Sequence, residues 1–323
     1  MDTANNPIQQ LLNARTSASF DVAPDVSGLQ IVMVNLFFVG EPGAGDWVLV
    51  DAGLQFSAPR IIRAAEERFG PGARPSAIVL THAHFDHVGA LPGLLEQWGD
   101  VPIYAHTWEM PYLTGRSDYP PPDPTVGGGL MARLSMLYPN KATNFGDRVR
   151  PLPEDGTVPG MPGWRWIWTP GHAPGHVSLF RDSDRILIAG DAFVTTKQES
   201  AMAVLTQYQE VHGPPKYFTI DWQKAKESVE KLAALSPSVA ATGHGIPMSG
   251  ERLYHGLNQL AFNFERLAVP RDGRYVREPA LTDPNGVLMV PPPVPDPVPK
   301  IAAGVAIGAL VLGALTAGGR RRG

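Results

Sequence analysis

One short stretch of this chain, residues 81–89 with the sequence THAHFDHVG, limits most strongly what the chain can fold into. Three imidazoles and one carboxylate, from His82, His84, Asp86 and His87, occur within six positions after an apolar run. Neutral imidazole nitrogens bind metal ions, and a carboxylate supplies compensating negative charge. A polar loop whose histidines only form hydrogen bonds is the alternative, and the density of the cluster argues against it. We therefore interpret the stretch as half of a metal site.

The spacing within this stretch indicates how its side chains divide between ions. Side chains two positions apart on an extended segment point in the same direction, so His82 and His84 can share one ion. Asp86 and His87 follow the bend after the strand and can reach a second ion.

The same plan recurs at four other turns, where an apolar strand is followed by an aspartate or a histidine. These strands are expected at residues 47–50, 164–169, 185–189 and 239–242, and they are followed by Asp51, His172, Asp191 and His244. In open sheets the ligand crevice lies where the strands end. We therefore expect these side chains to converge with those of residues 82–87, although the chain spreads them widely.

Helical patterns alternate with these strands. The expected helices are residues 58–69, 91–98, 221–235 and 251–267, and further strands are expected at residues 29–39 and 101–105. A strand-helix-strand order implies parallel pairing. The sequence therefore predicts one α/β domain at residues 29–275, preceded by an N-terminal extension at residues 1–28.

Composition excludes several classes of partner and ligand. The formal net charge is −4 and the isoelectric point is near 6.1, so we expect no nucleic-acid partner. The chain has no cysteine, so a metal must be held by nitrogen and oxygen atoms. A small-molecule substrate fits this composition.

The C-terminal region differs from the rest of the chain. Residues 276–300 are expected to form a proline-rich linker, since proline recurs at alternate positions near its end. Residues 301–317 are uncharged and mostly apolar, close to the lower limit of about 17 residues that span a bilayer. We interpret this segment as a hydrophobic transmembrane anchor and residues 318–323 as a basic tail. A non-inserted or removed tail is the alternative.

Two expectations follow from this interpretation of the C-terminal region. No basic region followed by an apolar stretch begins the chain, so we expect a membrane-anchored protein with a cytoplasmic catalytic domain. Gly304 and Gly308 form a small-xxx-small pair that could pack against a second copy, which makes a homodimer possible.

Aromatic residues, methionine and turn residues mix between Trp108 and Tyr138. This insertion is either a lid that selects an apolar substrate or an ordinary connecting segment packed on the domain, and both interpretations stay open. His176 is expected to pack or to form hydrogen bonds, and His212 could line a substrate cleft.

Taken in chain order, this set of residues resembles the metallo-β-lactamase-fold hydrolases, with every metal-ligand position filled from residue 29 to residue 267. The resemblance implies a four-layer αββα sandwich with two mixed β-sheets and a metal site at one edge. It implies that a first metal is held by His82, His84 and His172, a second by Asp86, His87 and His244, and that Asp191 bridges them. Asp51 would orient the histidine loop.

The implied activity is that of a dinuclear metal-dependent hydrolase that cleaves an ester, thioester or lactone through a metal-bridging hydroxide. Asp86 would be the catalytic group that accepts a hydrogen bond from this hydroxide and passes a proton on. Residues 169–176, TPGHAPGH, are similar to the hydroxyacylglutathione hydrolase and lactonase branches. The residues after Asp191 lack the tyrosine expected of a homoserine lactonase.

The implied cofactors are two divalent metal ions. Zinc is favoured, and iron or manganese suits the same nitrogen and oxygen ligands. An iron-dependent oxidoreductase similar to persulfide dioxygenases is the alternative function, followed by a β-lactamase. A binding domain whose site has decayed is a third class, and the complete ligand set argues against it.

Overall fold

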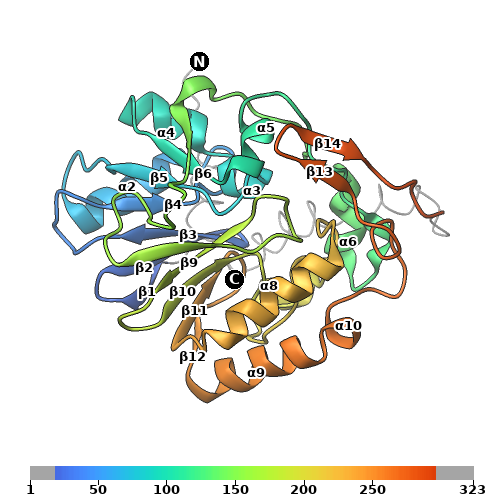
Figure 1. The fold of residues 1–323 in the computed structure, drawn as a ribbon. Coiled ribbons are helices and arrows are strands. Elements are labelled where there is room, and N and C mark those ends of the chain that lie inside the picture. The colour runs from blue at the N-terminus through green and yellow to red at the C-terminus, as the bar shows by residue number, and fades with distance from the viewer. Residues whose placement is uncertain (1–18, 296–323) are drawn as a thin grey trace, which may run out of the picture.

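Two mixed β-sheets lie face to face in this protein, with helices on their outer faces (Figure 1). The structure is a computed structural model that describes residues 19–295. The prediction of an α/β fold with two mixed sheets is therefore confirmed.

The larger sheet runs in sequence order. Its strands are β1 (Ser19–Ala23), β2 (Val26–Ile31), β3 (Val34–Val39), β4 (Val48–Val50), β5 (Ala77–Val79), β6 (Ile103–Ala105) and β7 (Val149–Pro151). The pairs from β1 to β4 are antiparallel, and the pairs from β4 to β7 are parallel. The expected parallel strand-helix-strand unit corresponds to β5, the helix at residues 91–98, and β6.

The smaller sheet has the order β12-β11-β10-β9-β8. Its strands are β8 (Trp164–Trp168), β9 (Val177–Arg181), β10 (Ile186–Gly190), β11 (Val239–Thr242) and β12 (Met248–Ser249). Only β10 and β11 pair in parallel within this sheet. A separate hairpin joins β13 (Leu281–Asp283) to β14 (Gly286–Met289).

The longer helices cover the outer faces of the sheets. They are α2 (Ala58–Phe69), α4 (Leu91–Trp98), α8 (Trp222–Ala234) and α9 (Gly250–Phe262). Helices α2 and α4 pack on the larger sheet, and α8 and α9 pack on the smaller one (Figure 1). The shorter α-helices are α3 (Phe85–Val88), α5 (Met110–Leu113), α6 (Leu130–Leu134), α7 (Ala201–Thr206) and α10 (Phe264–Leu267), and the 3₁₀ turns are η2 (Thr107–Glu109), η3 (Pro124–Val126), η4 (Ser135–Leu137) and η5 (Gly146–Arg148).

Strand β3 shows why the sequence contains nearly continuous apolar runs. Alternate residues of a strand point to opposite faces. Leu36 and Phe38 pack against the helices, whereas Phe37 and Val39 pack toward the other sheet. Both faces are therefore buried, and the strand cannot alternate apolar with polar residues.

Local sequence patterns placed several helices correctly. Helix α2 has the predicted bounds, with Pro59 in its first turn and Ile61, Ala65 and Phe69 buried on one face. Helix α4 also has its predicted bounds. Helix α8 begins after Asp221, whose side chain accepts a hydrogen bond from the Lys224 N–H at 3.0 Å.

The single strand predicted at residues 29–39 is instead a hairpin of β2 and β3. The chain reverses at Val32 and Met33, and Val32 has a positive φ of 59°. A β-branched residue rarely adopts this conformation, so the turn carries no turn-forming residue. Because both arms are apolar, the run looked continuous.

Strands also occur outside residues 29–275, the predicted domain. Strand β1 lies within the expected N-terminal extension, and β13 and β14 lie within the expected linker. Both regions therefore contribute ordered strands.

The predicted membrane anchor and C-terminal hydrophobic helix are corrected. Among residues 19–295, no helix is both long enough and apolar enough to cross a membrane. The 301–317 segment on which that prediction rested lies outside the described residues. The described structure therefore gives no support for a membrane-anchored protein.

The buried layer between the two sheets should contribute strongly to stability. Leu179 of β9 is fully buried there, so Leu179→Ala is expected to lower the free energy of unfolding by about 2–5 kcal/mol. Urea denaturation measures this change. Leu288→Ala removes a side chain that is 66% exposed and should cost less than about 0.5 kcal/mol. Equal losses in the two variants would contradict this account of the core.

Candidate metal centre

Seven side chains predicted from the sequence converge at the ends of the strands. His82 and His84 follow β5, and Asp86 and His87 lie on the short helix α3. The other three, His172, Asp191 and His244, follow β8, β10 and β11 of the smaller sheet. The site therefore draws ligands from both sheets.

The converging side chains form three groups that could each hold a metal ion. Within each group, the ligand atoms lie within 4.8 Å of one another. The groups are His82, His84 and His172; His82, His87 and Asp191; and Asp86, His87 and His244. Since two groups share His82 and two share His87, the three form one continuous cluster.

Asp191 lies at the centre of this cluster. Its Oδ2 atom is 3.1 Å from His244 Nε2, 3.4 Å from His172 Nε2 and 3.6 Å from His87 Nε2. Asp86 approaches from one side, with Oδ2 3.5 Å from His244 Nε2. All of these side chains are buried, and Asp86 is the most exposed at 8%.

The donor atoms fit a resident cation. His82 Nε2, His87 Nε2 and Asp191 Oδ1 are buried and have no hydrogen-bond partner among the described residues. A buried polar atom without a partner is costly, and such atoms call for an explanation. His82, His87 and Asp191 form one of the three groups, and imidazole nitrogens together with a carboxylate oxygen are suitable ligands for a divalent cation.

The first three imidazoles are held in the neutral form that binds metals. Burial lowers the pKa of His82 and of His84 well below the usual value, and neighbouring imidazoles act in the same direction. Burial lowers the pKa of His172 to about 4. Their nitrogen lone pairs are therefore available at neutral pH.

The other members of the cluster are charged by their neighbours. Burial opposes the charge on His87, but the carboxylates of Asp51 and Asp191 outweigh it and raise the His87 pKa well above its usual value. Burial also opposes the charge on Asp191, but His244 and His87 hold its pKa well below the usual value. A cation here would compete with the proton for the His87 nitrogen.

Asp51 orients the histidine loop, as the resemblance implied. Its carboxylate accepts hydrogen bonds from the backbone N–H and the hydroxyl of Thr81, both at 2.8 Å. His87 Nδ1 lies 2.8 Å from the Asp51 Oδ2 atom, which leaves His87 Nε2 facing the cluster. Asp51 itself has a positive φ of 62°. Such strained backbone is typical of functional sites.

Two supporting contacts were missed at the sequence level. Asn35 appeared only as an interruption of a strand, yet its Nδ2 donates to the carbonyl oxygens of Thr242 at 2.8 Å and Gly245 at 2.6 Å. The carbonyl of Met33 lies 2.7 Å from His244 Nδ1 and so orients that ring. A polar residue within a buried apolar run was the available indication of this role.

His176 forms hydrogen bonds as predicted. Its Nε2 accepts from the Asp191 backbone N–H at 2.8 Å, and its Nδ1 lies 2.9 Å from the Thr169 hydroxyl. His176 therefore supports the turn that carries Asp191.

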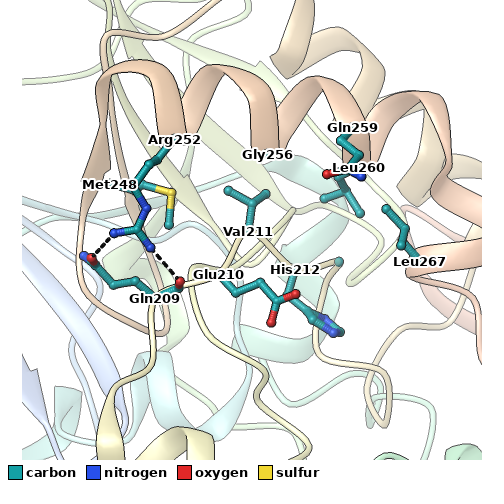
Figure 2. A pocket seen from close by; sticks show the side chains of 11 residues that line it. Gln209, Glu210, Val211, His212, Met248, Arg252, Gly256, Gln259, Leu260 and Leu267 are labelled. Carbon is teal, nitrogen blue, oxygen red and sulfur yellow. Dashed lines mark hydrogen bonds between the residues drawn. The ribbon is translucent and has the colours of Figure 1, made fainter.

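His212 lies away from the cluster of predicted ligands. It lines a cavity of about 420 Å³ between helix α9 and residues 209–213 (Figure 2). Arg252 crosses one side of this cavity and donates hydrogen bonds to Gln209. None of the seven predicted ligands lines this cavity.

Comparison with known proteins identifies the family. Residues 30–244 match the family model of the metallo-beta-lactamase superfamily. The chain therefore belongs to this superfamily. The superfamily implies divalent metal ions, in agreement with the three groups of possible ligands described above.

The chain is similar to a "Probable metallo-hydrolase YflN" from Bacillus subtilis. The two are 49% identical over 258 residues, which covers 80% of this chain and 97% of that protein. A hydroxyacylglutathione hydrolase from Erwinia tasmaniensis is 28% identical over 167 residues, covering 52% of this chain and 50% of that protein. The crystal structure of a beta-lactamase domain protein from Burkholderia ambifaria shares the fold, with a TM-score of 0.52, 22% identity and 76% of each chain covered.

Asp51→Asn should weaken metal binding without changing any predicted ligand. The amide replaces one acceptor oxygen by a donor, so it cannot accept from the Thr81 backbone N–H and from His87 together. We expect a loss of metal affinity of about 10–100-fold, measured by competition with a chromogenic chelator. Asp182→Asn alters an exposed carboxylate and should bind as the wild type does. Unchanged affinity in Asp51→Asn would contradict this role.

Proposed function

We propose that this protein is a metal-dependent hydrolase that uses two divalent cations to cleave an ester, thioester or lactone of a small molecule. The observation that carries the proposal is the convergence of seven side chains from both sheets into three possible metal-binding groups. The family match and the similarity to a probable metallo-hydrolase support a metal-dependent hydrolase.

In this proposal, the ligands divide into two sets. One ion is held by His82, His84 and His172, which form one of the possible groups. Its neighbour is held by Asp86, His87 and His244, which form another. Asp191 is shared, since its carboxylate lies near histidines of both sets.

Zinc is the metal that we propose, although the same donors also suit iron and manganese. Divalent cations in such a site polarise a substrate carbonyl and lower the pKa of a bound water toward neutrality. The protein contributes the neutral imidazoles that hold the ions and the surrounding burial that excludes bulk water.

Asp86 is the residue to which we assign proton transfer. Burial raises the pKa of its carboxyl above the usual value, which favours a proton acceptor at neutral pH. Its Oδ2 atom lies beside His244, and it is the most exposed of the seven side chains. Asp86 Oδ2 would take a proton from the attacking water and deliver it to the leaving group.

An aromatic cluster beside the ligands supports an apolar substrate group. The Phe218 ring stacks against His84 with centroids 4.4 Å apart and an interplanar angle of 26°. Tyr138, from the aromatic insertion, lies 5.7 Å from Phe85 and 5.5 Å from Tyr217 between ring centroids. We propose that Phe85 and Tyr138, which are only partly buried, present the edge of this cluster to the apolar part of the substrate.

The proposed bond class rests on the similarity to the hydroxyacylglutathione hydrolase and lactonase branches. One relative is named a hydroxyacylglutathione hydrolase, and residues 169–176 carry the resemblance to that branch. An ester or lactone carbonyl requires the same polarisation and proton transfer. A panel of substrates decides among them.

Metal analysis and a substrate panel test this proposal. We expect about two divalent ions per chain and turnover of a thioester, lactone or aryl ester, measured by elemental analysis and product formation. Asp86→Ala should lower kcat at least about 100-fold because both a proposed ligand and the proton acceptor are lost. Asp182→Asn is the matched control with an exposed carboxylate.

Three results would contradict the proposal. They are less than one metal ion per chain, full activity in Asp86→Ala, and phosphodiester cleavage as the only activity. Native iron with oxygen uptake on a persulfide would favour the oxidoreductase alternative, and turnover of β-lactams alone would favour a β-lactamase.

A further inference from the structure

Glu109 is a fully buried carboxylate that the proposed chemistry does not use. It ends the 3₁₀ turn η2, which follows strand β6 of the larger sheet. Its Oε2 atom accepts a hydrogen bond from the backbone N–H of Ala83 at 2.9 Å, and its Oε1 atom accepts from the backbone N–H of Gly175 at 2.7 Å. One side chain thus binds two separate backbone segments.

These two segments carry proposed ligands from different sheets. Ala83 lies between His82 and His84, after β5 of the larger sheet. Gly175 lies three residues beyond His172, after β8 of the smaller sheet. His84 Nδ1 and His172 Nε2 are only 3.0 Å apart, so a small shift between the segments changes the space between the proposed ligands.

The surroundings of Glu109 favour a fixed carboxylate. The Tyr119 hydroxyl donates to Glu109 Oε2 and also accepts from the Ala83 N–H at 3.0 Å. The Tyr119 ring stacks on Tyr112 with centroids 3.9 Å apart and lies 4.6 Å from the His84 ring. Because every group that contacts the two carboxylate oxygens is a donor, an amide in place of the carboxylate loses at least one of these bonds.

Gly175 provides a second observation. A Cβ atom added there would lie 2.8 Å from the backbone nitrogen of Glu109 and 2.9 Å from its Cγ. Real Cβ atoms essentially never approach other atoms so closely, so a side chain at residue 175 would push the His172 segment away from η2. Glycine therefore permits the short contact between the His172 segment and η2.

We infer that Glu109 is a positioning residue that joins the two ligand-bearing segments and sets the spacing of His82 and His84 relative to His172. It acts through the backbone at Ala83 and Gly175 and is not itself a ligand. This inference rests on the proposed function, since the spacing matters only if these histidines bind a metal ion. Partners that hold ligands in place typically change metal affinity about 10–100-fold when they are lost.

Glu109→Gln tests the inference. The side chain keeps its shape but loses an acceptor, so we expect zinc affinity to fall at least about tenfold in chelator competition. The visible spectrum of the Co²⁺-loaded protein should also change, because the ligand spacing changes. Burial raises the pKa of the Glu109 carboxyl to about 7, although the hydrogen bonds that it accepts lower this pKa. The measurements are therefore made at pH 8, where the carboxylate form predominates.

Glu199→Gln is the matched control. Glu199 is also fully buried and accepts a backbone hydrogen bond, from the Lys216 N–H at 2.9 Å, but it does not contact either ligand-bearing segment through its side chain. It should keep the wild-type affinity and Co²⁺ spectrum. Equal losses in both variants would mean that any buried carboxylate is required, and the inference would fail.

Gly175→Ala is the second variant, in case Glu109→Gln does not fold. It leaves the Glu109 carboxylate in place but separates the His172 segment from η2. We therefore expect the same loss of zinc affinity and the same change in the Co²⁺ spectrum as in Glu109→Gln. Wild-type affinity in either folded variant would overturn the inference. A wild-type protein that binds neither Zn²⁺ nor Co²⁺ would overturn the proposed function first, and the two failures are therefore distinguishable.

Discussion

Eight ionisable side chains lie together at the strand ends, where burial excludes most water. The strand ends can be arranged in this way only if the charges of these side chains are compensated. Asp51, Asp86 and Asp191 are buried among five imidazoles. A buried carboxylate without partners costs several kcal/mol, so each must face a donor or a cation. Asp51 is satisfied by Thr81 and His87, whereas one oxygen of Asp191 has no hydrogen-bond partner among the described residues. The nitrogens of His82 and His87 that likewise lack a partner in the described part of the chain belong to the same possible metal-binding group as Asp191, so a cation there would satisfy them.

The seven proposed ligands could be found from the sequence because each follows an apolar strand that local patterns reveal. The pattern indicates the strand, and sheet topology then brings the strand ends together. The partners of supporting residues, by contrast, cannot be read from the sequence. Asn35 contacts the carbonyls of Thr242 and Gly245, more than 200 positions away, and Glu109 contacts Ala83 and Gly175. Only the folded chain brings these pairs together, so no local spacing predicts them.

Errors in the predicted fold have a related cause. Strand β1 is short, and its alternation rests on Phe20 and Val22 alone, so the apolar pattern is too brief to indicate a strand by itself. The β2–β3 turn contains Val32 at positive φ instead of glycine or asparagine, because the buried arms on both sides determine the register. Tertiary packing overrides local preference in both places. Helix α2, by contrast, combines a first-turn proline with regular apolar spacing, and its bounds could be predicted.

Two buried carboxylates, Asp51 and Glu109, hold the histidine loop in place relative to different parts of the fold. Asp51 follows β4 and binds Thr81 and His87, so it fixes the histidine loop relative to its own sheet. Glu109 follows β6 and binds Gly175 as well, so it fixes that loop relative to the other sheet. Apolar packing between sheets is non-directional and tolerates small sliding, whereas hydrogen bonds to a fixed carboxylate do not. The proposed metal centre therefore needs both: burial to bring the sheets together, and directional bonds to set the spacing of proposed ligands that belong to different sheets.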